Sequence, residues 1–354
     1  MSGHPPDRMD FGDPGLFLHD LDPASGRARF VRTDRVALSA EPFLDHRWRA
    51  AEEASVAAPL ADLPSFTHEA PRLSFIWHTS FCASTLMSAC LDTPGRCLAL
   101  KEPRVLVQLA ALKRTKGLGT SSGLAKSVFG LLGRRFDPDE PILIKPSNGA
   151  NTLIVEAAAV TRGRMLLMYS DCESFVLSMA KQGRAGFAYV RERFRSLAAD
   201  GHPAAHWPAG ELLRLTDLEL AALVWRMQMD ALEAASARLG GRARSLNCRR
   251  FLEDPGTILS GVDDFLGLQI GAEQLDEVAA GALFSRDAKH PGQTFDARAR
   301  AEQQRRLRGQ FGADIQAVLR SMDDAFPRPP VLAPPLLIDP PSRDRSDERR
   351  VAFA

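Results

Sequence analysis

The sequence LSFIWHTSFCASTL at residues 73–86 decides the fold. Its apolar beginning, residues 73–77, has the length and aromatic content that predict a buried strand. Small and hydroxyl residues follow, and an apolar helical segment begins at Leu86. A strand, a turn of small residues and a helix together aim backbone N–H groups at a phosphate, where the helix dipole adds positive charge. An ordinary strand, turn and capped helix is the alternative interpretation of this stretch alone.

The composition bounds the class of protein. Of 354 residues, 45% are hydrophobic and 25% are charged, which is usual for a soluble globular protein. A net charge of +1 gives no electrostatic reason to expect a nucleic-acid or membrane partner. The five Cys show neither a CxxC pair nor Cys/His metal spacing, and residues 1–15 lack the apolar core of a signal peptide. The sequence therefore predicts a cytoplasmic protein without a metal, and it leaves the oligomeric state open.

Strands and helices alternate in the middle of the chain. Four more short apolar runs, each ending in a polar turn, lie at residues 97–100, 141–144, 164–168 and 244–247. Such alternation implies right-handed crossovers and a mainly parallel sheet. The second half is mostly helical, with apolar residues at helical spacing over residues 217–239. We expect an α/β fold in three layers around a five-stranded sheet.

Three regions follow from this pattern. Residues 1–70 are predicted to form an N-terminal extension, with a hairpin of strands at 15–19 and 29–32 and a helix at 47–58. Residues 71–327 form the main domain. Residues 328–354 are rich in Pro and charge and are predicted to be a disordered tail.

Polar side chains cluster after four of the predicted strands. The groups are Thr79 to Thr85, Lys101 with Glu102, Lys145 with Ser147 and Asn148, and Ser170 with Asp171. The carboxyl ends of parallel strands meet at one edge of the sheet, where open α/β folds bind ligands. A surface ion pair or a helix cap explains any one group, but four at one edge favour a binding site.

Three motifs resemble those of the P-loop sulfotransferase family, over residues 73–326. The segment from Phe81 to Thr85 is similar to the family's 5′-phosphosulfate loop, which reads cation, Ser or Thr, Gly, and two Ser or Thr. The sequence SDCESFVLS at residues 170–178 resembles the 3′-phosphate motif R-x-P-x-x-x-x-x-S. SLN at 245–247, RFLEDP at 250–255 and FLG at 265–267 resemble the family's late segment, E-D-L-x-x-D-P followed by F-L-G.

The resemblance implies transfer of a sulfuryl group from 3′-phosphoadenosine 5′-phosphosulfate to a hydroxyl or amine of a small-molecule or glycan acceptor, without a metal. It also implies the residues that contact the donor: Ser80, Phe81, Cys82, Ala83, Ser84, Thr85, Ser170, Ser178, Arg286 and Lys289. The last two lie in a basic loop similar to the family's R-K-G lid over the 3′-phosphate. A solvated basic loop is the alternative for that segment.

The resemblance also indicates a general base. Cytosolic members use the His of a K-x-H motif after the third strand, but this chain has Lys145-Pro146-Ser147 there. Other branches use a Glu after the second strand, which corresponds to Glu102. We expect Glu102 to take the acceptor proton and Lys101 or Lys145 to stabilise the bridging oxygen. Alternatively, Glu102 is a carboxylate at a helix N-terminus with no catalytic role, and His78 is then the next candidate base.

The chain departs from the family at three positions. Phe81 and Ser170 stand where the family has cations, and Ala83 replaces its Gly. The two missing cations, at Phe81 and Ser170, favour an alternative function, a catalytically altered nucleotide-binding module of the same fold. A small-molecule kinase is a third possibility, and the missing Walker Lys argues against it.

Overall fold

The centre of the fold is a five-stranded parallel sheet. The computed structural model describes residues 9–48, 55–66, 73–117, 123–285 and 297–325. Neighbouring strands pair in the order β5-β6-β4-β7-β8, each pair parallel. The strands are β4 (Leu73–His78), β5 (Leu98–Lys101), β6 (Ile142–Lys145), β7 (Met165–Tyr169) and β8 (Ala243–Asn247). Every strand predicted for this sheet overlaps an observed one, so the predicted α/β class is confirmed.

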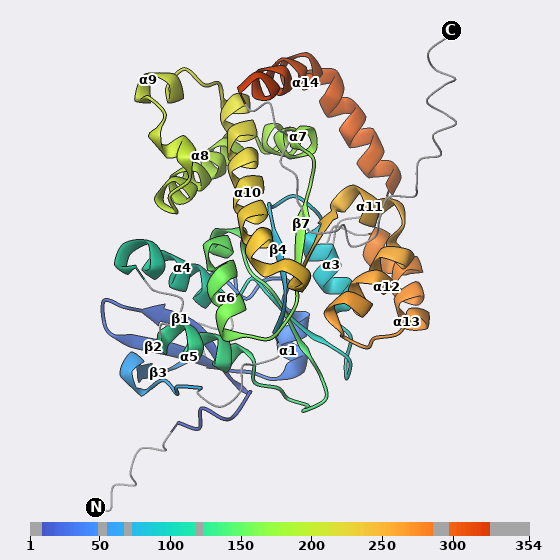
Figure 1. Ribbon diagram of the computed structural model, residues 1–354. Helices are drawn as coiled ribbons and strands as arrows, with labels where there is room; N and C mark the ends of the chain where they lie inside the picture. The colour runs from blue at the N-terminus through green and yellow to red at the C-terminus, as the bar shows by residue number, and fades with distance from the viewer. Residues whose placement is uncertain (1–8, 49–54, 67–72, 118–122, 286–296, 326–354) are drawn as a thin grey trace, which may run out of the picture.

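Helices cover both faces of this sheet and complete the three layers (Figure 1). Successive side chains of a strand point to opposite faces, so Phe75 and Trp77 of β4 join one hydrophobic cluster and Ile76 joins another. The first face carries α4 (Arg104–Lys116), α5 (Gly123–Leu132), α6 (Ile154–Val160) and the C-terminal part of α10 (Asp217–Leu239). The second face carries α3 (Ser84–Leu91), α11 (Cys248–Glu253), α12 (Pro255–Leu266) and α13 (Ala272–Ala280).

The second half of the chain is mostly helical, as predicted, and several of its helices pack around a third hydrophobic cluster. It joins α7 (Cys172–Gln182), α8 (Arg184–Ala199), α10 and α14 (Ala297–Ala325). The remaining helical segments are α9 (Ala209–Leu212) and the 3-10 turns η1 (Leu60–Asp62), η2 (Asn148–Leu153), η3 (Pro203–His206), η4 (Gly240–Arg242) and η5 (Ala282–Ser285). Phe81, just after β4, packs against this third cluster, which therefore borders the carboxyl edge of the sheet.

The strand order places the key stretch at a topological switch point. After β4 the chain adds β5 and β6 on one side of β4, and then crosses over to add β7 and β8 on the other side. In open α/β sheets, ligands bind at the carboxyl edge where the order reverses in this way. The turn after β4 lies at that position.

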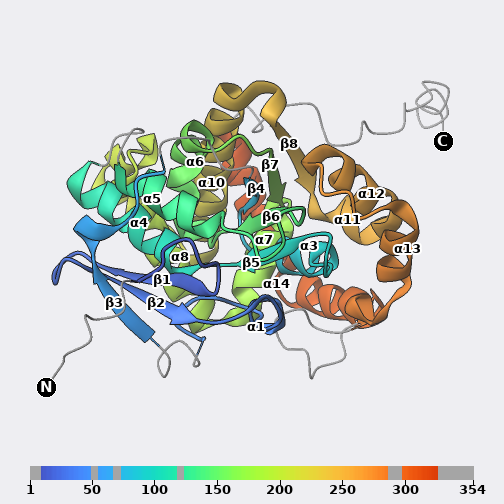
Figure 2. The same cartoon turned by 90° about the horizontal axis from the view of Figure 1, so that it is seen from below.

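The N-terminal region packs as a second, three-stranded antiparallel sheet (Figure 2). The predicted hairpin is confirmed as β1 (Leu16–Asp22) and β2 (Arg27–Arg32). The predicted helix at 47–58 is wrong over its described C-terminal part, because residues 55–58 belong to β3 (Ser55–Pro59), which pairs with the free edge of β2, and tertiary pairing overrides a weak local helix preference. The sequence analysis also missed α1 (Arg35–Ala40), whose start is marked by the Asp34 carboxylate accepting the Ala37 N–H.

Two predictions concern segments that the structure does not describe. They are the disordered tail predicted at 328–354 and the basic loop with Arg286 and Lys289. Within the described ranges, no helix combines the length and apolar composition needed to cross a membrane.

Buried His19 of β1 makes stability sensitive to mild acid. Its Nδ1 has no hydrogen-bond partner among the described residues, and its ring meets the Trp48 ring edge-on at 5.4 Å. Burial lowers the pKa of His19 from 6.5 to about 4, although the nearby Asp20 carboxylate opposes the shift. Between these two values the unfolded chain binds the proton and the folded chain does not, so stability falls as the pH falls from 6.5 toward 4.

We expect His19→Phe to remove this acid sensitivity while keeping the ring contact with Trp48. The wild type should lose about 1–2 kcal/mol more than the variant between pH 7.5 and pH 5, after allowance for solvent screening. Urea unfolding of both proteins at the two pH values measures the difference. Equal losses would mean that the imidazole is not held neutral in the folded protein.

Candidate functional site

The turn between β4 and α3 has an unusual backbone. Ser80, Phe81 and Ala83 have positive φ values of 71°, 51° and 56°, although none is Gly. Non-Gly residues in this region cost energy and concentrate at functional sites. Ala83 is the residue before α3 and occupies the position of the family's Gly, so the left-handed backbone explains why a Gly suits that position.

His78 holds the turn in this shape. Its Nδ1 accepts the N–H of Ser80 at 3.0 Å. Nε2 therefore carries the proton and donates to the Pro146 carbonyl, also at 3.0 Å. The Asn151 amide donates to the His78 carbonyl at 2.9 Å. Both ring nitrogens are thus used to position the turn, which argues against His78 as the general base.

A positioning role for His78 predicts that His78→Asn retains function. Asn accepts the N–H two residues on in an Asx turn, so the contact to Ser80 survives. The sulfuryl transfer that the resemblance implies should stay within about tenfold of the wild-type rate, whereas loss of a general base costs about 10²–10⁴ in rate. His78→Ala, which keeps no acceptor, serves as the control and should lower the melting temperature more than His78→Asn. A loss of 10² or more with Asn at unchanged melting temperature would make His78 the base.

A polar network from three other elements reaches Ser80. The Ser80 hydroxyl lies 2.8 Å from the Tyr189 hydroxyl of α8. The Asn148 amide donates to Tyr189 at 2.6 Å and to Gln228 of α10 at 2.8 Å. Burial raises the pKa of Tyr189, and the neighbouring Arg193 guanidinium opposes that rise, so the phenol stays neutral and shares one hydrogen bond with the Ser80 hydroxyl. The sequence analysis missed Tyr189 and Gln228, because they lie on helices with no motif around them.

Phe81 points away from the turn into apolar surroundings. Its ring meets the rings of Phe175 at 6.4 Å and Tyr189 at 6.0 Å, both edge-on. The position at which the family has a cation is therefore part of the cluster formed by α7, α8, α10 and α14. A cation for the site has to come from another element.

Lys145 is that cation. Its ammonium, buried at the end of β6, donates a hydrogen bond to Oε1 of Glu102. The Glu102 N–H in turn donates to the Lys145 carbonyl at 2.7 Å, and Glu102 has a positive φ of 56°. Burial raises the pKa of the Cys82 thiol in the turn, and the Ser84 hydroxyl and then the Lys145 ammonium oppose that rise. Lys145 therefore lies between Glu102 and the turn, as expected for a cation that acts at both.

The N-terminal region adds two side chains to this pair. An Arg47 guanidinium nitrogen lies 3.5 Å from the second Glu102 carboxylate oxygen. The same guanidinium lies 3.5 Å from the centre of the Phe43 ring, and the Lys145 ammonium lies 5.8 Å from it. Backbone hydrogen bonds fix this segment, because Leu44 donates to the Lys101 carbonyl at 2.7 Å. The sequence analysis gave residues 1–70 no role in the site.

Lys101 and Lys145 pair in register on neighbouring strands, but their ammonium groups have different partners. The Lys101 ammonium lies 2.9 Å from the Asp92 carboxylate and 2.6 Å from the Ser39 carbonyl. Asp92 ends α3 and Ser39 belongs to α1. Of the two lysines named as candidates, Lys145 is the one beside Glu102, and Lys101 makes a structural contact.

The two serines of the 3′-phosphate motif are in different surroundings. The Ser170 hydroxyl, just after β7, is buried without a partner in the described part of the chain, and the Thr79 hydroxyl after β4 is in the same state. Ser178 lies within α7 and donates back to the Ser174 carbonyl at 2.8 Å. Whether Ser170 and Ser178 contact a 3′-phosphate stays a prediction.

The start of α3 completes the site. Ser84 and Thr85 are buried at its N-terminus, and no side chain caps that end. The first N–H groups of a helix have no partner within the helix. The N–H groups at the start of α3 therefore have no side-chain cap. They lie at the turn together with the partial positive charge of the helix dipole.

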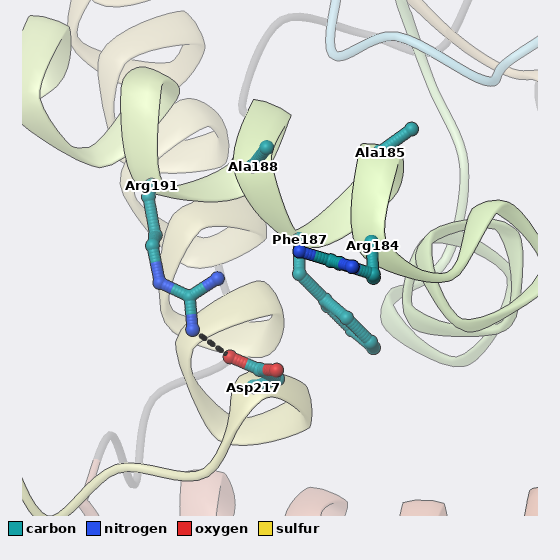
Figure 3. A pocket seen from close by; sticks show the side chains of 6 residues that line it. All are labelled: Arg184, Ala185, Phe187, Ala188, Arg191 and Asp217. Carbon is teal, nitrogen blue, oxygen red and sulfur yellow. Dashed lines mark hydrogen bonds and ion pairs between the residues drawn. The ribbon is translucent and has the colours of Figure 1, made fainter.

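A separate cavity of about 610 Å³ lies on the other side of α8 (Figure 3). Its lining residues are Arg184, Ala185, Phe187, Ala188, Arg191 and Asp217. Residues three and four apart share one helix face, and the stripe from Arg184 to Arg191 is opposite to the face with Tyr189 and Arg193. An ion pair between Arg191 and Asp217 closes one wall. This cavity is not part of the site around the turn.

Comparisons with known proteins give distant structural matches. No protein-family model matches the chain, and no curated protein matches its sequence. The sulfotransferase domain from the curacin biosynthetic pathway is 14% identical, covers 69% of this chain and 99% of its own, and has a TM-score of 0.43. A sulfotransferase from Alicyclobacillus acidocaldarius is 12% identical, covers 74% of this chain and 98% of its own, and has a TM-score of 0.38. Because both TM-scores are below 0.5, the function proposed next depends on the residues of the site.

Proposed function

We propose that the protein transfers a sulfuryl group from 3′-phosphoadenosine 5′-phosphosulfate to a hydroxyl or amine of an acceptor. One observation carries the proposal: the ion pair of Glu102 and Lys145 lies beside a strained turn that leads into an uncapped helix at the switch point of a parallel sheet. An anion site and a base-and-cation pair are what group transfer between two oxygens needs.

The residues around the turn fit the 5′-phosphosulfate of such a donor. The N–H groups at the start of α3 would bind its oxygens, as helix N-termini bind phosphate and sulfate. Two buried hydroxyls, those of Thr79 and Ser170, lie after the adjacent strands β4 and β7 and have no partner among the described residues. Buried polar groups without a partner are costly, so their presence at this edge supports a polar ligand there.

Glu102 and Lys145 then divide the chemistry. The bond from sulfur to the donor's phosphate oxygen breaks, and a bond from sulfur to the acceptor oxygen or nitrogen forms. Glu102 takes the acceptor proton as the acceptor attacks. Lys145 stabilises the negative charge on the oxygen that leaves, and its buried side chain holds Glu102 in one rotamer. Arg47 holds the other carboxylate oxygen.

A nucleotide-binding module without transfer is the second candidate. Two observations favour it: Phe81 lies in apolar surroundings, and both oxygens of the Glu102 carboxylate already have a cationic partner. This alternative keeps the anion site and loses only the chemistry.

Two measurements separate these possibilities. Calorimetry with 3′-phosphoadenosine 5′-phosphate tests for the anion site, with ATP as the comparison. Transfer of radiolabelled sulfate to a mixed set of phenols, sugars and amines then tests for activity. Binding with transfer supports the enzyme, and binding with no transfer to any acceptor supports the module. Tight binding of ATP with none of the bisphosphate would overturn the sulfotransferase, and binding of neither nucleotide would overturn both candidates.

A further inference from the structure

Arg193 of α8 is a buried cation that forms no ion pair with an acidic side chain of the described residues. Its residue is 8% exposed. Its Nε is buried without a hydrogen-bond partner, and no carboxylate in the described ranges forms an ion pair with it. Arg stays charged in proteins, and a buried charge without a partner is strongly unfavourable.

Other enclosed arginines of this chain are satisfied, which makes Arg193 an exception. Arg35 pairs with Glu140 and Asp92. Arg134 donates to the carbonyls of Phe11, Asp13 and Leu16. Arg242 donates to the carbonyls of Ala158, Thr161 and Gly163. The fold therefore supplies acceptors where an arginine has only a structural role.

The Arg193 guanidinium lies at the edge of the site. Its carbon is 5.8 Å from the centre of the Tyr189 ring, whose hydroxyl bonds to Ser80 of the turn. Its terminal nitrogens lie 3.3 Å from the point at which a Cβ on Gly149 would stand. Gly149 belongs to η2, which follows the carboxyl end of β6. A side chain at position 149 would press against the guanidinium, which would have to shift slightly.

The strand order indicates which reactant this cation serves. The turn follows β4, and the serines of the 3′-phosphate motif follow β7 on one side of it. Glu102, Lys145 and Gly149 follow β5 and β6 on the other side. A nucleotide that extends from the turn toward Ser170 leaves the β6 side for the acceptor. Arg193 is on that side.

We infer that Arg193 binds an anionic group of the acceptor, so that the acceptor is a hydroxyl or amine compound carrying a carboxylate, sulfate or phosphate. That the bound compound is a sulfuryl acceptor rests on the proposed function. The anion site at Arg193 does not depend on it. An anion on the guanidinium would form the charge-assisted hydrogen bonds that the described side chains do not supply.

The Nε–H of Arg193 is the direct probe of the site. Its nitrogen–proton NMR signal is assigned by its loss in Arg193→Lys. We expect it to shift when inorganic sulfate is added and to shift further with 4-hydroxyphenylacetate in the presence of 3′-phosphoadenosine 5′-phosphate. A signal that responds to neither anion overturns the inference. A signal that moves with the nucleotide alone assigns Arg193 to the donor and overturns it too.

Arg193→Met separates a binding role from a structural one. Removal of an unpaired buried charge should raise the melting temperature by about 2–4 °C or more. In calorimetry with the nucleotide present, the variant should lose about 10–100-fold in affinity for 4-hydroxyphenylacetate relative to neutral 4-ethylphenol. Arg191→Met, on the opposite face of α8, should leave that ratio unchanged. A lower melting temperature with an unchanged ratio would show that Arg193 is structural.

Failure of this inference is distinct from failure of the proposed function. If the nucleotide does not bind but the Nε–H signal responds to sulfate, the sulfotransferase proposal falls and the anion site stands. If the nucleotide binds and the signal stays silent, only the acceptor inference falls.

Discussion

Replacement of Glu102 by Gln is expected to slow sulfuryl transfer by about 10²–10⁴ and to change affinity for 3′-phosphoadenosine 5′-phosphate by less than about tenfold. Gln keeps the size and one oxygen of Glu102 but cannot take a proton from the acceptor. The nucleotide would contact the turn and α3 rather than Glu102, so its affinity should survive. Single-turnover transfer and calorimetry on the same preparation measure the two quantities.

The ion pair complicates this substitution and calls for controls. Without the Glu102 charge, the buried Lys145 ammonium is left unbalanced, and stability should fall by about 1–3 kcal/mol. Glu140→Gln is a matched control, because Glu140 is also paired with a cation, Arg35 at 2.9 Å, away from the turn. It should lose similar stability and keep transfer. Glu102→Gln combined with Lys145→Met should recover stability and remain inactive.

Two results would contradict the role of Glu102. Undiminished transfer by Glu102→Gln would move the base to another residue. Equal loss of transfer by Glu102→Gln and Glu140→Gln, in step with their stabilities, would give Glu102 a structural role only.

The sheet was predictable because the local sequence of most of its strands already indicates a buried strand. Four of the central strands, β4 to β7, are short, largely apolar runs that end in a polar turn, and burial on both faces requires that pattern. The N-terminal helix prediction failed for a related reason. The Ser55–Pro59 segment is short and weakly patterned, so its structure is set by the edge of β2, which the local sequence does not reveal.

The site was predictable only where it follows strand ends. Glu102, Lys145 and the turn come directly after strands, so topology brings them together. Lys101 looks equivalent to Lys145 in sequence, and only the distant Asp92 and Ser39 distinguish them. Arg47, Tyr189 and Arg193 reach the site from elements far away in sequence. Nothing in their immediate neighbours indicates those contacts.

Substitution of Gly163 by Ala is expected to cause the largest loss of stability. Gly163 precedes β7, and a Cβ there would lie 1.5 Å from the Leu73 carbonyl oxygen and 2.8 Å from the Ser74 nitrogen. Both atoms are backbone atoms of β4, so no side-chain rotation relieves the clash. The first ladder bond between the two strands, from Phe75 N–H to the Arg164 carbonyl at 2.9 Å, lies next to it. We expect a loss of at least about 3 kcal/mol in urea unfolding.

The same clash, at the beginning of β4, should also affect the turn at its end. Since β4 is only six residues long, a shift at Leu73 reaches His78, whose contacts to Ser80 and Pro146 hold the turn. Any folded fraction of Gly163→Ala should therefore bind 3′-phosphoadenosine 5′-phosphate more weakly than the wild type. Gly312→Ala is the control, because no atom lies near a Cβ at that position of α14, and Ala should stabilise the helix by up to about 1 kcal/mol. Equal stability of the two variants would mean that β4 and β7 tolerate a wider separation than their register indicates.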